Sequence, residues 1–403
     1  IQNTLIGGLA GDALTDADHN VAVGMNALTA DTLGSKSTAI GTGALGTQNF
    51  TTATNVYNTA VGYDAGVSVT TGTINTYIGG KAGSTSNTAA SNVAVGYDSL
   101  ALNTKGSKNV AVGESALYTF NVTTATDTYN TAVGHHAGVS VSTGVQNTFV
   151  GAHAGDATDD GTNNVAVGFE ALSANCGSGN TTLGCRAGKA TTADNNTIVG
   201  HSAGILVNTG EQNTFVGNLA GQNVTTGNNN VLLGHSCETP AVDTAQVIGI
   251  GSSVTTQAAN NFTFGFGSTD SNIAFGATSI SAPSDERYKE NIATSTAGLS
   301  FIKDLRPVTF QWKKEKDVPS NHKAYVEGSD KRVMESQGET NHGFIAQEVK
   351  AAIDNHTELK DGFNMWAEDP TDGRQRLGDG ALIPMLTKAV QELSTALDAA
   401  LAR

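Results

Sequence analysis

The first part of the chain repeats a short pattern in which Asn, two variable residues, an aliphatic residue and Gly follow one another. A Val or Thr two positions before the aliphatic residue gives the alternation of a short strand. The spacing is mostly 17 residues, sometimes 16 and twice 21, and Asn opens thirteen of the fourteen units, with Ser37 as the exception. The repeat glycines are Gly7, Gly24, Gly41, Gly62, Gly79, Gly96, Gly113, Gly134, Gly151, Gly168, Gly184, Gly200, Gly217 and Gly234.

A strand this short cannot bury an apolar face alone, but stacked copies can share a continuous core. The repeat therefore predicts a parallel β-roll or β-solenoid over residues 1–237. We expect the two β-branched positions of each unit to form the buried ladder of the coils. Alanine stands three residues after the glycine in twelve units, which indicates a tight interior. The asparagine amides are expected to bond to one another along the stack.

Units such as NVAVG resemble the head repeats of trimeric autotransporter adhesins. That resemblance implies a trimeric assembly of parallel β-rolls. Residues 238–283 differ in character, because short alternating strands there carry Phe262, Phe264, Phe266 and Phe275. We interpret this segment as a β-stem, with three chains wound together, that links the repeats to the domain that follows.

Composition places a domain boundary near residue 283. The chain has 48 Gly, only 6 Pro and 6% aromatic residues, and no Pro precedes Pro240. Only six of the 22 Lys and Arg residues, and neither Trp, lie before residue 284. The net charge of −15, without basic clusters, argues against nucleic-acid partners and anionic membranes. No apolar run is long enough to span a bilayer. Because the chain begins with Ile1 rather than Met, we expect a fragment of a longer protein.

Four ordered blocks follow the boundary: SDERYKENI, LRPVTFQWK, HGFIAQEVK and LIPMLTKAVQELSTAL. They resemble the intramolecular chaperone auto-processing domain found behind phage endosialidases, tail fibres and neck appendages. The resemblance spans residues 284–403. It implies a domain that assembles three chains, drives their folding and then releases itself with a Ser-Lys dyad. On the family motif, Ser284 matches the cleavage-site serine, Asp285 follows the cut and Lys289 matches the dyad lysine.

The chemistry agrees with this pairing. A serine hydroxyl needs a nearby base, and lysine serves where desolvation favours its neutral form. The nearest histidine in the sequence is His322. If the cut follows Ser284, attack by that hydroxyl on its own carbonyl needs a strained small ring. Attack on the carbonyl of residue 283 would cut before Ser284, and a serine of a neighbouring chain or a positioned water are further routes. The mechanism stays open at this point.

The C-terminal tail predicts a trimerisation helix. Its apolar residues are spaced 3, 4, 3, 4 and 3 apart, which is a short heptad seam, and Pro384 suits a first helical turn. The seam residues are Ile383, Leu386, Val390, Leu393, Leu397 and Ala400. The predicted fold class is thus mostly β: trimeric β-solenoid repeats and a β-stem, followed by an α+β chaperone domain that ends in a short coiled-coil helix.

Other candidate sites are weaker, and no metal or cofactor is predicted. Three cysteines, Cys176, Cys185 and Cys237, lack metal-ligand spacing and are interpreted as small buried residues. Two acidic clusters, one beginning at Asp12 and one at Asp156, lack EF-hand spacing and are interpreted as polar loops. Several histidines follow repeat glycines; we interpret them as solvated turn residues, with metal sites on a trimer axis as the alternative. They are His135, His136, His153, His201 and His235.

These features together predict a homotrimeric viral tail fibre or spike, located on the virion and bound to a glycan or protein receptor of the host surface. Its one enzymatic event is self-cleavage at Ser284–Asp285. Two alternatives stay open: a spike that depolymerises surface polysaccharide, and a cellular surface adhesin that carries the same chaperone. Stacked β-coils have a high contact order and therefore fold slowly. A trimerising domain that follows them would help by holding the three chains in register.

Overall fold

The structure is a computed structural model that describes residues 2–277, 279–282, 284–334, 340–359, 363–369 and 373–403. The chain divides into two compact units, Ile1–Ser284 and Asp285–Arg403. Among the described residues, none of the helices combines the length and the apolar character needed to cross a membrane.

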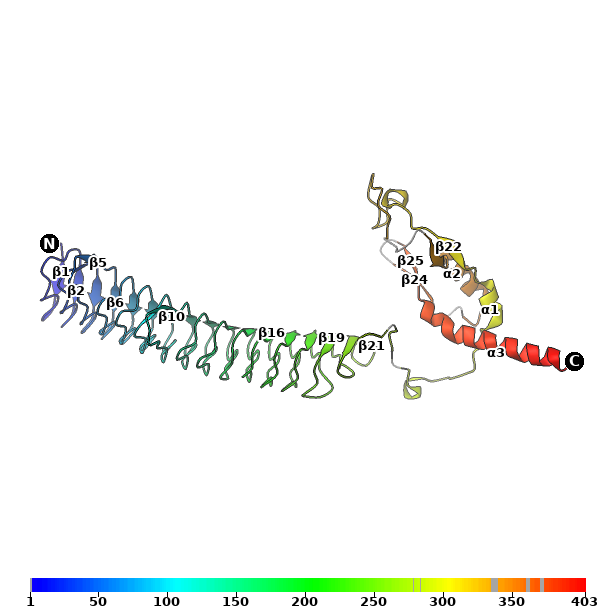
Figure 1. Cartoon of the computed structure of the whole chain (residues 1–403), viewed down its shortest axis with the longest axis horizontal. Coiled ribbons are helices and arrows are strands. Elements are labelled where there is room, and N and C mark those ends of the chain that lie inside the picture. The colour runs from blue at the N-terminus through cyan, green and yellow to red at the C-terminus, as the bar shows by residue number, and fades with distance from the viewer. Residues whose placement is uncertain (1, 278, 283, 335–339, 360–362, 370–372) are drawn as a thin grey trace. The chain divides into compact units, whose positions relative to one another are not determined.

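The first unit is a β-solenoid in which each repeat adds one strand to a parallel sheet (Figure 1). Neighbouring coils pair in register, so that the same repeat position always stacks on itself; Ala111 of β10, for example, pairs with Ala132 of β12. All of this pairing lies within one chain. The sheet runs through β1 (Thr4–Ile6), β2 (Val21–Val23), β4 (Thr38–Ile40), β6 (Thr59–Val61), β7 (Thr76–Ile78), β8 (Val93–Val95), β10 (Val110–Val112), β12 (Thr131–Val133), β13 (Thr148–Val150), β14 (Val165–Val167), β15 (Thr181–Leu183), β16 (Thr197–Val199), β17 (Thr214–Val216) and β18 (Val231–Leu233).

The sheet continues past residue 237 within the same chain. Strand β19 (Val247–Ser252) pairs in parallel with β18, and β20 (Asn261–Phe266) pairs in parallel with β19. Strand β21 (Ser271–Ala274) then turns back antiparallel to β20. The winding of three chains in this segment stays a prediction. Two further two-stranded pairs accompany the longer 21-residue repeats: β3 (Gly34–Ser35) with β5 (Thr54–Asn55), and β9 (Gly106–Ser107) with β11 (Thr126–Asp127).

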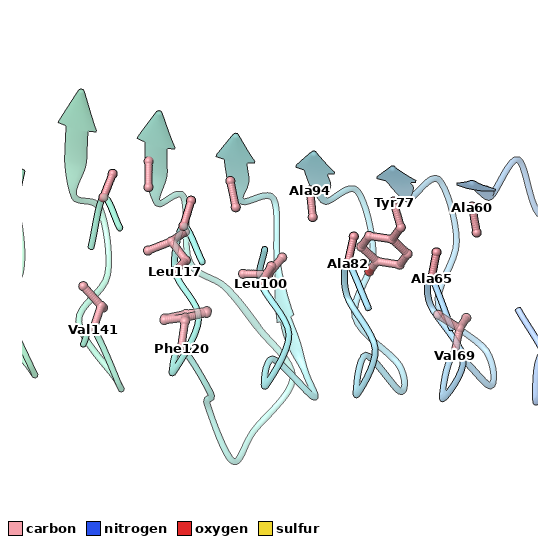
Figure 2. Close-up of a cluster of buried hydrophobic side chains, with 14 of the residues drawn as sticks. Ala60, Ala65, Val69, Tyr77, Ala82, Ala94, Leu100, Leu117, Phe120 and Val141 are labelled. Atoms are coloured by element: carbon pink, nitrogen blue, oxygen red, sulfur yellow. The ribbon is translucent and has the colours of Figure 1, made fainter. Parts of the chain in front are cut away.

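The interior of the solenoid is lined by the middle residue of each three-residue strand from β2 to β18, not by the flanking β-branched residues. Ala94 and Tyr77 are fully buried, and Figure 2 shows them inside successive coils together with Leu100 and Leu117. The prediction that the two β-branched residues of each unit form the buried ladder was therefore wrong, because these residues lie on the opposite face of the strand. Because side chains alternate along a strand, a shift of one position moves the whole set outward. A narrow coil accepts a small or single flat residue at its centre more readily than two branched ones.

The core also explains why some repeats carry Leu and others Gly four residues after the repeat glycine. Leu100 and Leu117 fill coils whose strand has Ala at its centre. Where the centre is aromatic, that position is glycine: a Cβ at Gly83 would lie 2.5 Å from the ring of Tyr77. Each slice of the interior thus holds about one large side chain. Tyr77 keeps its polar end satisfied by a 3.0 Å hydrogen bond to Ser86, and burial raises its pKa to about 12.

The repeat glycines are required twice over. Gly151 has a φ of +133°, a conformation that other residues rarely adopt. A Cβ at the same position would also lie 2.6 Å from the carbonyl oxygen of Gly168 in the next coil. The stacked coils approach so closely at this turn that no side chain fits between them.

The predicted asparagine ladder is confirmed. The backbone N–H of Asn164 donates to Oδ1 of Asn147 over 2.9 Å, and Nδ2 of Asn147 donates to the carbonyl of Gly161 over 2.8 Å. The same two bonds recur along the stack and satisfy buried backbone groups. Where Ser37 replaces the asparagine, Gln48 fills its place: its amide donates to Ser37 over 3.0 Å and accepts from Asn58 over 2.9 Å.

The buried cysteines also follow from the packing of the coils. Cys176 and Cys237 are buried, as expected, and burial raises the pKa of each thiol to about 11. Cys185 is only half-buried, contrary to the expectation, because it lies directly after the repeat glycine Gly184 in the outer turn.

The second unit is a small α+β fold built around a core that contains Phe301, Val349, Ile353, Met365 and Leu382. Among its described residues, two antiparallel strand pairs, β22 with β23 and β24 with β25, accompany three α-helices. Its elements are η1 (Glu286–Tyr288), α1 (Leu299–Asp304), β22 (Val308–Phe310), η2 (Glu315–Asp317), β23 (Asn341–Gly343), α2 (Ala346–Asn355), β24 (Trp366–Glu368), β25 (Gln375–Leu377), η3 (Asp379–Ala381) and α3 (Leu382–Leu401).

The predicted fold class is confirmed in its main terms: a mostly β chain, with a β-solenoid followed by an α+β unit that ends in a helix. The trimeric state and the coiled coil stay predictions, as does the division into residues 1–237, 238–283 and 284–403.

Candidate functional site

The predicted cleavage bond lies at the boundary between the two compact units. Ser284 is the last residue of the first unit and Asp285 is the first residue of the second. Ser284 is exposed, and no helix or strand includes it. An exposed bond between two compact folds is the kind of bond that can be cut without unfolding either.

Asp285 begins the short 3₁₀-helix η1 as its N-cap. One carboxylate oxygen accepts the backbone N–H of Arg287 over 2.9 Å, as a capping aspartate does. The Arg287 guanidinium also pairs with the carboxylate through Nη2 over 2.6 Å. Hydrogen bonds from Arg287 hold the pKa of Asp285 below its usual value, and the positive charge of Lys289 lowers it further. Asp285 is therefore an anion that fixes the start of the turn.

Lys289 ends the same turn as its C-cap. Its backbone N–H donates to the carbonyl of Glu286 over 3.0 Å, and its side chain is exposed. The candidate nucleophile and base thus lie on either side of a single helical turn. Lysine acts as a general base where burial favours its neutral amine. In the single chain the side chain of Lys289 is exposed to solvent.

The segment HGFIAQEVK contributes to the core of the second unit. Val349 is buried in the core of the second unit and Phe344 packs against it. His342 lies on β23, opposite Thr309 of β22, with its side chain exposed.

Sequence reasoning did not single out His356, which ties two helices of the second unit together. Its side chain is 10% exposed and bonds through Nε2 to Asp304 over 2.8 Å and through Nδ1 to Glu358 over 3.1 Å. The two carboxylates, Asp304 first, raise the pKa of His356 above its usual value. Asp304 ends α1 while His356 follows α2, so only the folded contact between these helices could identify the pair.

Helix α3 presents two different faces. Leu382, Met385 and Ala389 are buried, and Glu392 accepts the backbone N–H of Leu299 at the start of α1 over 2.8 Å. The predicted heptad seam lies on the exposed part of the helix. Its apolar members are exposed by 45% or more: Ile383, Leu386, Val390, Leu393 and Leu397. A folded domain that leaves an apolar seam in water presents a surface suited to other helices.

The solenoid also exposes an apolar ladder, which we call the outer ladder. It consists of the flanking strand residues that the in-register stacking aligns on the outside of the sheet. Its exposed aliphatic members are Ile6, Ile40, Ile78, Val93, Val133, Val165, Leu183, Val216 and Ile250.

Comparison with known proteins identifies the C-terminal segment. Residues 284–358 match the family model described as the chaperone of endosialidase, a peptidase family. No curated protein and no solved structure matched the chain. The match begins at Ser284, at the junction of the two units. The protein is therefore a β-solenoid that carries a chaperone-of-endosialidase domain behind it, an arrangement that fits a tail fibre with a C-terminal chaperone.

Proposed function

We propose that this chain is the precursor of a homotrimeric virion fibre or spike, and that its second unit trimerises the β-solenoid and then releases itself by cutting the Ser284–Asp285 bond. The released solenoid attaches the particle to a glycan or protein receptor on the host surface. The observation that carries the proposal is the start of the chaperone family match at Ser284, the residue at which the first compact unit ends.

Two exposed apolar surfaces support the trimer. The outer ladder runs along the sheet, and the heptad seam runs along α3. Both repeat regularly, and a regular surface is best covered by copies of itself in the same register. We assign both surfaces to contacts with the other two chains.

Trimerisation also supplies what the proposed Ser-Lys chemistry needs. Ser284 and Lys289 are exposed in the single chain. Packing of three chains around η1 would exclude water from the turn and favour the neutral amine of Lys289. Cleavage would then depend on assembly, so that only a correctly registered trimer loses its chaperone. Loss of the chaperone removes the path back and leaves the fibre kinetically trapped.

The proposal is tested by the products of expression. The wild-type chain should appear on a denaturing gel as two fragments, one ending at Ser284 and one beginning at Asp285. Ser284→Ala and Lys289→Ala should each leave a single full-length band, because nucleophile and base are both required. Mass spectrometry of the smaller fragment should give Asp285 as its first residue.

Two matched variants control for general effects on folding. Ser300→Ala and Lys303→Ala alter an exposed serine and an exposed lysine of the same unit, on α1, and should cut normally. Normal cutting by Lys289→Ala would exclude Lys289 as the base. A wild-type chain that stays intact as a soluble trimer would exclude self-release altogether.

A further inference from the structure

Three histidines from two neighbouring coils of the solenoid converge on one point of its surface. His135 and His136 follow the repeat glycine after β12, and His153 lies in the equivalent turn after β13. One ring nitrogen of each lies within 4.8 Å of the others. We propose that His135, His136 and His153 form a binding site for a divalent transition-metal ion of the zinc class, which clips the two coils together.

Stacking of the coils fixes the positions of these residues. The backbone N–H of His136 donates to the backbone carbonyl of Glu114 in the previous coil over 3.0 Å. The backbone N–H of His153 donates to the backbone carbonyl of His135, also over 3.0 Å. The rings of His135 and His136 stack with centroids 3.9 Å apart, and both meet the ring of His153 edge-on. Ligand nitrogens in a tetrahedral zinc site lie about 3.4 Å apart, given a Zn–N distance of about 2.1 Å. Rotation of the exposed His135 ring and of the half-buried His136 and His153 rings would close that difference.

The residue types of the cluster suit a transition-metal ion. Imidazole nitrogens are preferred ligands of zinc, copper and nickel. Each of the three rings offers one nitrogen to a shared ion, and these nitrogens all lie within 4.8 Å of one another.

A carboxylate orients one of the three rings. Nδ1 of His153 lies 3.1 Å from Oδ2 of Asp156, three residues further along the same turn. A histidine that gives one ring nitrogen to a carboxylate presents the other to a metal, and such partners raise ligand basicity. Glu114, whose Oε2 lies 4.0 Å from Nε2 of His135, is within reach of a fourth ligand position.

The chain contains its own comparison for this site. Residues 58–83 repeat at 130–155 with the same pattern, 72 residues later. In the first copy, Tyr63, Asp64 and Lys81 stand where the second copy has the three histidines. The backbone is the same, since φ is +58° at Lys81 and +56° at His153. The turn therefore needs no histidine to fold.

The test is equilibrium dialysis of the 403-residue chain against Zn²⁺ near neutral pH. We expect one Zn²⁺ per chain, and a melting temperature that rises with Zn²⁺ concentration because the ion binds only the folded coils. The variant His135→Tyr with His153→Lys restores the residues of the first copy, and should fold normally and lose the site. Asp156→Asn should weaken binding about 10- to 100-fold, as expected for loss of a carboxylate that orients a ligand.

His19→Asn is the matched control, since His19 is an exposed turn residue with a similar φ of +61° that lies far from the cluster along the chain. It should bind Zn²⁺ as the wild type does. Absence of bound Zn²⁺ in the wild type, or unchanged binding in the double variant, would overturn the proposal. Equal competition by Mg²⁺ would overturn it as well, because a hard ion would indicate carboxylate ligands rather than imidazoles.

Discussion

At the scale of single residues, the solenoid depends on buried side chains that hydrogen-bond backbone N–H and carbonyl groups. The asparagine ladder is buried. The backbone N–H of Asn147 donates to Oδ1 of Asn130, and its side-chain amide bonds in turn to Asn164 and Gly161. Such a group cannot be lost without leaving a donor and an acceptor that water cannot reach. This explains why thirteen of fourteen units keep Asn, and why Gln48 takes over beside the one exception.

We expect Asn147→Ala to destabilise the solenoid by about 2–4 kcal/mol, because it orphans the N–H of Asn164 and the carbonyl of Gly161. Thermal unfolding followed by circular dichroism measures the effect. Asn218→Ala, the same change at an exposed position, should leave the melting temperature nearly unchanged. Equal effects of the two variants would contradict a structural role for the ladder.

A second residue-scale prediction concerns Glu238 at the C-terminal end of the repeats. Glu238 is 9% exposed, and its carboxylate accepts the backbone N–H of Gln222 over 2.8 Å. Burial raises its pKa from 4.5 to about 7. The folded state therefore holds a proton that the unfolded chain releases above pH 4.5, and stability falls as the pH rises from 4.5 towards 7.

Glu238→Gln keeps the acceptor and removes the charge. Above pH 7 it should stabilise the solenoid by about 2–3 kcal/mol, and below pH 4.5 it should match the wild type. Melting temperatures of the wild type and the variant across this pH range test the predicted pH dependence. A constant difference between them at every pH would show that the charge of Glu238 is not the cause.

At the scale of elements, helix α3 has two faces that lie in different environments. One face completes the core of its own unit, whereas the heptad seam stays in water. A seam this short is marginal for a free helix. Anchored at Leu382 and Met385, it starts from a fixed geometry, which lowers the entropic cost of meeting two further copies.

We expect Val390→Asp to abolish trimers, since Val390 is 65% exposed on the seam and a buried carboxylate there would lack a partner. The change is best made in the Ser284→Ala background, so that α3 stays attached to the solenoid, with mass measured by light scattering. Gln391→Asp adds the same charge one position away from the seam and should stay trimeric. A trimeric Val390→Asp protein would exclude the seam as the assembly surface.

The elements also show what sequence reasoning could and could not achieve. The repeat period, the requirement for glycine and the role of asparagine follow from local chemistry, because the same contact recurs in every coil. Local chemistry did not predict which face of each strand points into the core. Strands of three residues give only one alternation, so Val21 and Ala22 were equally plausible as core residues, and the width of the coil decides between them.

At the scale of the whole molecule, the chaperone match could be predicted because sequence blocks keep their order. The family match begins at the predicted serine and covers residues 284–358, which contain three of the four blocks; the extension to residue 403 stays a prediction. In the proposed trimer, the environment of Lys289 would depend on contacts between chains, which local sequence patterns do not specify. The sequence pattern named these histidines and left metal sites on a trimer axis as an alternative, but the convergence of His136 and His153 within one chain follows only from the stacked coils.

In-register stacking has a final consequence for how such a protein can evolve. The 72-residue duplication contains four coils, and each coil advances the sheet by about 4.8 Å. Unequal recombination between the two copies would insert or excise whole coils, and would change the reach by about 20 Å while every junction kept a native neighbour. The length of the solenoid can therefore change by whole coils during evolution, without any change in how its interior packs.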